Sequence, residues 1–197
     1  MSLSNEKELK KLLAKPLFRA SEARTLGIHP SRLSYYVKIN LMERINRGVY
    51  RGIHSEVNAD FQWEDLVLIA QSIPSGVICL VSALAIYGLT DEIPREHWIA
   101  IPHSTTPPKR DNTRFIRMRD TTTGKIHYRL GQENITLFNQ ERTIVDAFRY
   151  LSKEIAIKAL KEAAKSKNEQ KLDFKKLKKY AQKFKINLDL YILMVTT

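Results

Sequence analysis

The sequence has little cysteine and no long apolar run. Cys79 is its single cysteine, so no disulfide can form within the chain, and a reducing cytoplasm is the expected compartment. No apolar run approaches the roughly 20 residues of a membrane span, and the N-terminus lacks the apolar segment of a signal peptide. We therefore expect a cytoplasmic protein with no membrane partner, in which Cys79 is a buried core residue.

The sequence also lacks the residue patterns of common catalytic sites. Its five histidines include no pair spaced four apart and have no cysteine partners, so a zinc site has little support. There is no glycine-rich phosphate loop and no nucleophile-elbow pattern. We therefore predict no metal, no cofactor and no catalysis. A metal-dependent nuclease is the enzymatic alternative, assembled from loop carboxylates with a lysine nearby: Asp91, Glu92, Asp111, Asp120 and Lys125.

Positive charge is abundant and unevenly placed. The formal net charge is +12, which favours a polyanionic partner, nucleic acid first and an anionic membrane surface second. Residues 1–58 carry 11 basic against 5 acidic side chains, residues 59–150 carry 10 against 11, and residues 151–197 carry 12 against 5. A near-neutral middle between two basic ends implies that the parts of the chain have separate roles.

Residues 21–51 have the order of signals expected of a winged helix-turn-helix. Ser21 is the expected N-cap of a short helix that ends near Leu26. Gly27 suits the left-handed conformation common at helix ends, and Pro30 suits the first turn of a second helix. One helix thus ends and another begins within about four residues, as a helix-turn-helix requires.

The second of these helices is expected to read DNA. Leu33, Tyr36 and Val37 form its apolar stripe, which leaves a polar and cationic face exposed. Arginine can bind a guanine edge with two hydrogen bonds, and serine or tyrosine can reach phosphates or bases. The predicted DNA-facing residues of this helix are Ser31, Arg32, Ser34, Tyr35 and Lys38.

Two strand-like runs follow, 42–45 and 48–51, and predict a β-hairpin that would form the wing. Gly48 is placed for the left-handed position of a bulged hairpin. Arg44, Arg47 and Arg51 could each neutralise a phosphate beside the groove. The alternative to a DNA-binding motif is an ordinary helical hairpin with a solvated basic face.

The rest of the chain predicts an α+β fold: an N-terminal winged helix-turn-helix, then a larger mixed α/β domain with a small sheet and a helical, lysine-rich C-terminus. Low periodicity over 52–59 places the boundary there, which gives domains at 4–55 and 59–197. Helices are expected over 5–14, 60–72, 139–151, 154–164 and after Asp173, and strands over 97–101, 115–119, 127–130 and 135–138. The apolar run 188–195 should enter the core or form an oligomer contact.

Two segments resemble the AbiEi family of antitoxins and transcriptional regulators from type IV toxin–antitoxin systems of abortive infection. The first is the motif Met42-Glu43-Arg44-Ile45-Asn46-Arg47-Gly48-Val49-Tyr50, which ends in the family's Arg-Gly-Val-Tyr wing. The second combines Val81-Ser82-Ala83-Leu84, Tyr87-Gly88-Leu89, the strand 98–102 and Glu141-Arg142-Thr143-Ile144-Val145-Asp146. The resemblance extends to about Leu151 and does not include the lysine-rich end.

The resemblance implies a repressor that binds inverted repeats in its own operator cooperatively and counteracts a nucleotidyltransferase-type toxin without a stable protein complex. By this resemblance, Arg32, Tyr35, Lys38, Arg44 and Arg47 correspond to the DNA-facing helix and wing. Arg142, Thr143 and Asp146 belong to a family motif of unassigned role, which a capped helix start with an Arg–Asp pair four residues apart would explain structurally. The non-enzymatic alternative is an interaction protein that binds its toxin directly. On DNA, a homodimer or cooperative binding is expected.

Overall fold

A computed structural model describes residues 3–92, 94–165 and 171–196. They form two compact units: one contains the N-terminal residues up to Pro74 together with Arg129–Ile135, and the other contains Ser75–Tyr128 and the residues from Thr136 onward. The α+β class is confirmed, with an N-terminal region of helices and short strands and a larger region that contains a sheet. The domain ranges 4–55 and 59–197 stay predictions. None of the helices in the described ranges is long and apolar enough to cross a membrane.

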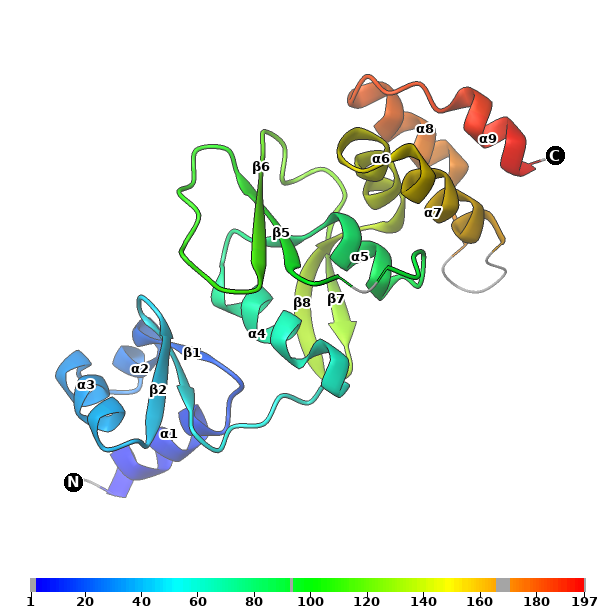
Figure 1. Ribbon diagram of the computed structural model, residues 1–197. Coiled ribbons are helices and arrows are strands. Elements are labelled where there is room, and N and C mark those ends of the chain that lie inside the picture. The colour runs from blue at the N-terminus through cyan, green and yellow to red at the C-terminus, as the bar shows by residue number, and fades with distance from the viewer. Residues whose placement is uncertain (1–2, 93, 166–170, 197) are drawn as a thin grey trace. The chain divides into compact units, whose positions relative to one another are not determined.

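The first unit combines helices with a three-stranded antiparallel sheet of order β1-β3-β2 (Figure 1). A bulge between Arg44 and Asn46 interrupts the β2–β3 pairing, as the position of Gly48 predicts. The elements are α1 (Leu3–Leu13), β1 (Phe18–Arg19), α2 (Ala20–Thr25), α3 (Pro30–Lys38), β2 (Met42–Asn46), β3 (Val49–Gly52), the 3₁₀ turn η1 (Phe61–Trp63) and α4 (Glu64–Ser72).

The core around this sheet gathers apolar side chains from α1, α2, α3 and the three strands. Phe18, Leu33 and Met42 are almost completely buried, and Phe18 stacks on Tyr50 with ring centroids 5.9 Å apart. Gly52 allows β3 to approach α1, because a Cβ atom there would lie 2.5 Å from the carbonyl oxygen of Leu13. The helices and the hairpin therefore form one packed unit.

Two sequence predictions in this unit need correction. Ser21 does not cap α2: the helix begins at Ala20, and the backbone N–H of Arg19 donates to the Glu22 carboxylate at 2.8 Å. The helix predicted over 60–72 begins with a 3₁₀ turn, and α4 itself begins at Glu64. In both places the start of the helix differs from the start that the local sequence favours.

The second unit is built on a five-stranded mixed sheet of order β6-β5-β4-β8-β7, of which the hairpin end of β7 and β8 counts with the first unit. β5 pairs in parallel with β6, and the short β4 is antiparallel to β5 and parallel to β8. The strands are β4 (Val77–Ile78), β5 (His97–Pro102), β6 (Thr113–Met118), β7 (Lys125–Leu130) and β8 (Glu133–Phe138), and α5 (Leu80–Ile86) follows β4.

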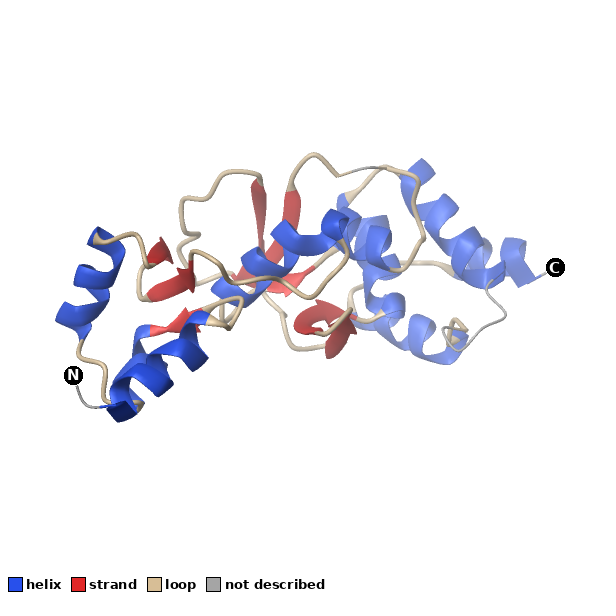
Figure 2. Cartoon of the chain, turned by 90° about the horizontal axis from the view of Figure 1, so that it is seen from below, coloured by secondary structure: helices blue, strands red, loops and turns tan. Residues whose placement is uncertain are grey.

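After β8 the described chain is helical (Figure 2). The apolar faces of these helices meet α5 in one core, which includes Leu84, Ile144, Leu160 and Leu177. The C-terminal apolar run is divided by its helix: Ile192 is buried, whereas Leu190, Leu193 and Met194 are exposed. The helices are α6 (Gln140–Tyr150), α7 (Lys153–Lys165), α8 (Phe174–Lys183) and α9 (Asp189–Thr196).

Candidate nucleic-acid interface

The chain positions α3 by a tight turn after α2. Gly27 has φ of +77°, the left-handed conformation predicted for it, and Pro30 occupies the first turn of α3. His29 is the N-cap of α3: its Nδ1 accepts from the backbone N–H of Ser31 at 3.3 Å and lies 2.8 Å from the Ser31 hydroxyl. This capping role of His29 is a finding of the structure.

One face of α3 is exposed and holds the predicted DNA-facing side chains. Leu33 and Tyr36 are buried, so the helix presents its opposite face to solvent. Arg32 and Lys38 form no side-chain hydrogen bond or ion pair with any residue in the described ranges. Their charges are therefore available to an anionic ligand. Ser31, Arg32, Ser34, Tyr35 and Lys38 all lie on the exposed surface.

The β2–β3 hairpin carries the three arginines predicted for a wing, and the structure gives them different environments. Arg44 is exposed and its Nε donates to the Asn46 carbonyl at 3.3 Å. Arg47 is exposed at the turn, where Asn46 accepts from its backbone N–H at 2.7 Å. Both guanidinium groups can reach solvent ligands, as a phosphate contact requires.

Arg51 differs from the other two. It is half-buried, and its guanidinium donates to the Ser55 hydroxyl at 3.0 Å and to the Ser55 carbonyl at 2.9 Å. Ser55 is itself buried and donates to the carbonyl of Gly52. These bonds hold the chain that leaves β3, so Arg51 has a structural role that the charge pattern did not reveal.

A second basic surface lies on α8. Asp173 caps the helix as predicted by accepting from the Lys176 backbone N–H at 3.0 Å, and Leu177 and Ala181 turn inward. Two of its lysines have acidic partners: Lys176 lies 3.7 Å from Glu141, and Lys183 lies 2.8 Å from Asp120. The exposed lysines on and beside this helix include Lys171, Lys175, Lys178, Lys179 and Lys185.

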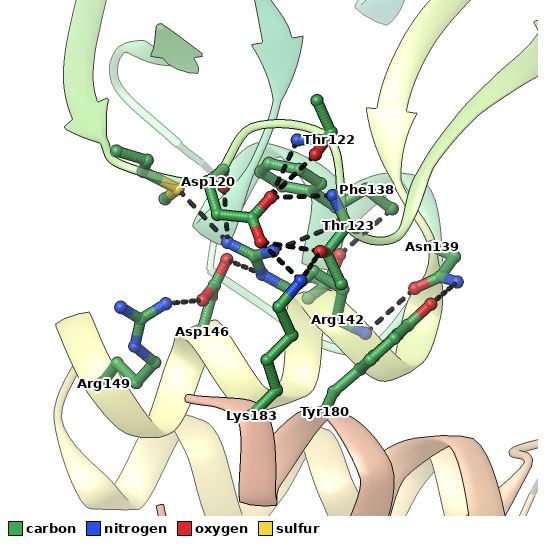
Figure 3. Close-up of polar contacts among 12 residues, drawn as sticks. Asp120, Thr122, Thr123, Phe138, Asn139, Arg142, Asp146, Arg149, Tyr180 and Lys183 are labelled. Atoms are coloured by element: carbon green, nitrogen blue, oxygen red, sulfur yellow. Dashed lines mark hydrogen bonds and ion pairs between the residues drawn. The ribbon is translucent and has the colours of Figure 1, made fainter. Parts of the chain in front are cut away.

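The motif at residues 141–146 of α6 forms a buried polar network (Figure 3). Arg142 is fully buried; its Nε donates to Asp146 at 2.7 Å, and its other nitrogens donate to the carbonyls of Thr123 at 3.0 Å and Asp120 at 3.1 Å. The Phe184 ring from the end of α8 lies 3.9 Å from the guanidinium. Arg142 therefore ties the loop after β6 to α6 and α8.

The other members of the motif complete this network. Asn139 caps α6 by accepting from the Arg142 backbone N–H at 3.0 Å, and the Thr143 hydroxyl donates to the Phe138 carbonyl at 3.2 Å. Burial raises the pKa of the Asp146 carboxyl group above its ordinary value, against the opposing effect of Arg142 and of Arg149, which lies 2.6 Å away. The Arg–Asp pair four residues apart and the capped helix start are thus confirmed as structural features.

Asp120 shares this loop and is held as a carboxylate. Burial alone would raise its pKa, but hydrogen bonds from Lys183, Thr123 and Thr122 outweigh burial and lower the pKa far below the ordinary value. Gly124 also allows this loop to lie close to α6. Its φ is +74°, and a Cβ atom there would lie 2.7 Å from the Cβ of Arg142. Sequence reasoning missed Gly124, although its place in a short turn between two strands was a signal.

The carboxylates of the nuclease alternative are dispersed. Asp91 pairs with Lys158, Asp120 belongs to the loop network, and Glu92 and Asp111 are exposed. Within the described ranges, no three His, Cys, Asp or Glu side chains are grouped to hold a metal ion. Cys79 is buried, as predicted, and burial raises the pKa of its thiol well above the ordinary value.

Comparison with known proteins bears on the first unit. A search of curated proteins found no match to the chain. Residues 8–51, which include α2, α3 and the β2–β3 hairpin, match the family described as transcriptional regulator, AbiEi antitoxin. The resemblance read from the sequence is thus confirmed over this segment, which is similar to a family of transcriptional regulators.

Proposed function

We propose that the protein is a sequence-specific repressor that binds its own operator as a winged helix-turn-helix protein and serves as the antitoxin of its operon. The observation that carries the proposal is the exposed face of α3, where Arg32 and Lys38 are left without acidic partners by the described residues. Exposed cations without acidic partners, next to polar side chains on the same helix face, can contact base edges and phosphates in the DNA major groove.

In this proposal, α3 enters the major groove and the β2–β3 hairpin is the wing. Arg32 near the N-terminal end of α3 is the candidate for a bidentate contact with guanine. Arg44 and Arg47 contact phosphates, which position the protein without reading sequence. A single module of this size buries little DNA surface, so tight binding requires a homodimer or cooperative occupation of inverted repeats.

The larger unit would set the spacing of protomers or carry the antitoxin activity, and the exposed lysines of α8 would add phosphate contacts. The partner of the antitoxin activity is a nucleotidyltransferase-type toxin, counteracted without a stable complex. The protein acts in the cytoplasm by binding and not by catalysis. To test the nuclease alternative, the bound DNA is incubated with Mg²⁺, and we expect the DNA to stay intact. To test direct toxin binding, the α3 region is deleted; co-purification of the remaining protein with the toxin would favour that alternative.

The proposal is tested with the DNA upstream of the protein's own gene. Fluorescence anisotropy across a salt series compares that duplex with a scrambled duplex of the same composition. We expect a preference for the cognate duplex of about 10³-fold or more that persists at physiological salt. Equal affinities with the same steep salt dependence would mean that the basic surface binds phosphates alone, and would refute the repressor function.

A further inference from the structure

The exposed face of α3 is not only polar. Tyr35 is 57% exposed and Ile39, four residues later, is 50% exposed, although both are large apolar or aromatic side chains. Residues four apart lie on the same side of a helix, so the two side chains form a stripe. Cations lie beside this stripe. Arg32 precedes Tyr35 by three residues, and Lys38 follows it by three and directly precedes Ile39.

Phe61, an exposed aromatic side chain of the same unit, has different surroundings. Phe61 is 91% exposed in the same unit, but its neighbours in sequence are Asp60 and, at the start of α4, Glu64. The acidic side chains near Phe61 repel a polyanion, whereas Arg32 and Lys38 attract one. The exposed face of α3, with apolar side chains beside cations that lack acidic partners, therefore suits a ligand that is anionic and also presents apolar groups.

DNA meets that description in one groove. In the major groove the thymine C5-methyl group is the apolar feature, and apolar side chains recognise it by contact. Resting on the proposed function, we propose that the Tyr35–Ile39 stripe reads thymine methyl groups in the operator, with the Tyr35 ring as the principal contact. Arg32 then supplies guanine recognition from the same face, so that the helix reads both kinds of base pair.

The contact predicts sensitivity to the methyl group itself. Replacing every thymidine of the cognate duplex with deoxyuridine removes the methyl groups and keeps the hydrogen-bonding edges. Burial of one such group contributes about fourfold in affinity. We therefore expect the deoxyuridine duplex to bind at least about fourfold more weakly, and more when two protomers each contact a methyl group.

Variants assign the effect to the stripe. Tyr35→Ser should bind the thymidine duplex more weakly and should lose most of the discrimination between thymidine and deoxyuridine. Tyr35→Phe should retain that discrimination, because the ring and not the hydroxyl touches the methyl group. Ile39→Ser should reduce it in part. Phe61→Ser is the matched control: it removes an exposed aromatic ring of the same unit and should leave both affinities unchanged.

The outcomes separate this inference from the proposed function. If wild-type protein prefers cognate over scrambled DNA but binds thymidine and deoxyuridine duplexes equally, the repressor function stands and the methyl contact is overturned. The methyl contact is also overturned if Tyr35→Ser still discriminates fully between the thymidine and deoxyuridine duplexes, because the difference in affinity would then come from the groove shape of the DNA. If Tyr35→Ser and Ile39→Ser instead lower the protein's mass in light scattering, the stripe joins two copies of the chain and the inference fails.

Discussion

Replacement of Arg142 by methionine tests whether the motif at residues 141–146 of α6 is structural. The guanidinium is fully buried, and it satisfies the Asp146 carboxylate and two loop carbonyl oxygens. Methionine keeps the apolar contact with the ring of Phe184 but supplies none of these hydrogen bonds. The substitution thus removes the polar interactions while largely retaining packed volume.

The magnitude follows from what the substitution leaves behind. Breaking a buried ion pair by removing one partner costs about 3–5 kcal/mol, because the other charge stays buried. Arg149 remains 2.6 Å from Asp146 and compensates that charge in part, which reduces the cost. The carbonyls of Asp120 and Thr123 lose their donor, and each unsatisfied buried group costs about 1–3 kcal/mol. Since these effects overlap, we expect a total loss of about 4 kcal/mol in the free energy of unfolding.

Urea unfolding measures this loss in the second unit. Trp98 packs against the cluster that contains Met118 and Phe138, so its fluorescence reports on the surroundings of Arg142. The other tryptophan, Trp63, is replaced by phenylalanine in all variants to isolate that signal. The midpoint should fall to much lower urea, and thermal unfolding should occur roughly 8–16 °C lower.

Arg149→Met is the matched control. Arg149 touches the same carboxylate but is 24% exposed, and its removal leaves the Arg142–Asp146 pair in place. We expect a loss of about 1 kcal/mol. If Arg142→Met changes the unfolding free energy by less than 1 kcal/mol while operator affinity or antitoxin activity collapses, the structural explanation of the motif is refuted and Arg142 acts in function.

Other predictions concern the DNA-binding face and the α6 contact. Arg32→Ala should cost about 1–3 kcal/mol of binding to the cognate duplex and relax sequence preference, whereas Arg47→Ala should weaken binding to all sequences and reduce the salt slope by about one, both measured by anisotropy. Gly124→Ala should lower the unfolding free energy by about 1–3 kcal/mol in urea titration, because its φ of +74° is strained for alanine and the new Cβ meets Arg142; wild-type stability would contradict the close approach. The lowered pKa of Asp120 means that its carboxylate stabilises the fold above about pH 3.8 and that this contribution is lost as the pH falls further, so Asp120→Asn should make the urea midpoint less sensitive to acid below pH 4 than in wild-type protein.

Several features of the first unit could be predicted because they depend on neighbouring residues. Gly27 and Pro30 mark the turn by their backbone preferences, and both occupy the predicted conformations. The left-handed Gly48 and the bulged hairpin follow from the same local chemistry. The apolar spacing of α3 likewise predicted which face is buried.

The path of the folded chain accounts for the predictions that failed or were incomplete. The chain enters α2 through β1, whose Arg19 pairs with Val49, so the helix begins before Ser21. Arg51 has the charge of a phosphate contact, but the path of the chain after β3 brings Ser55 to its guanidinium. Neither interaction is encoded in the spacing of residues around the affected position.

The sequence by itself determined most of the helices and strands, the basic ends and the polar face of α3, because composition and periodicity act over a few residues. The tertiary structure alone decided which charges are available. Arg142 donates to loop carbonyls and to Asp146, and Arg51 donates to Ser55, whereas Arg32 and Lys38 have no such partner among the described residues. The physical reason is that desolvation and hydrogen bonding depend on neighbours in space, and identical side chains become structural or available for binding according to the segments packed around them.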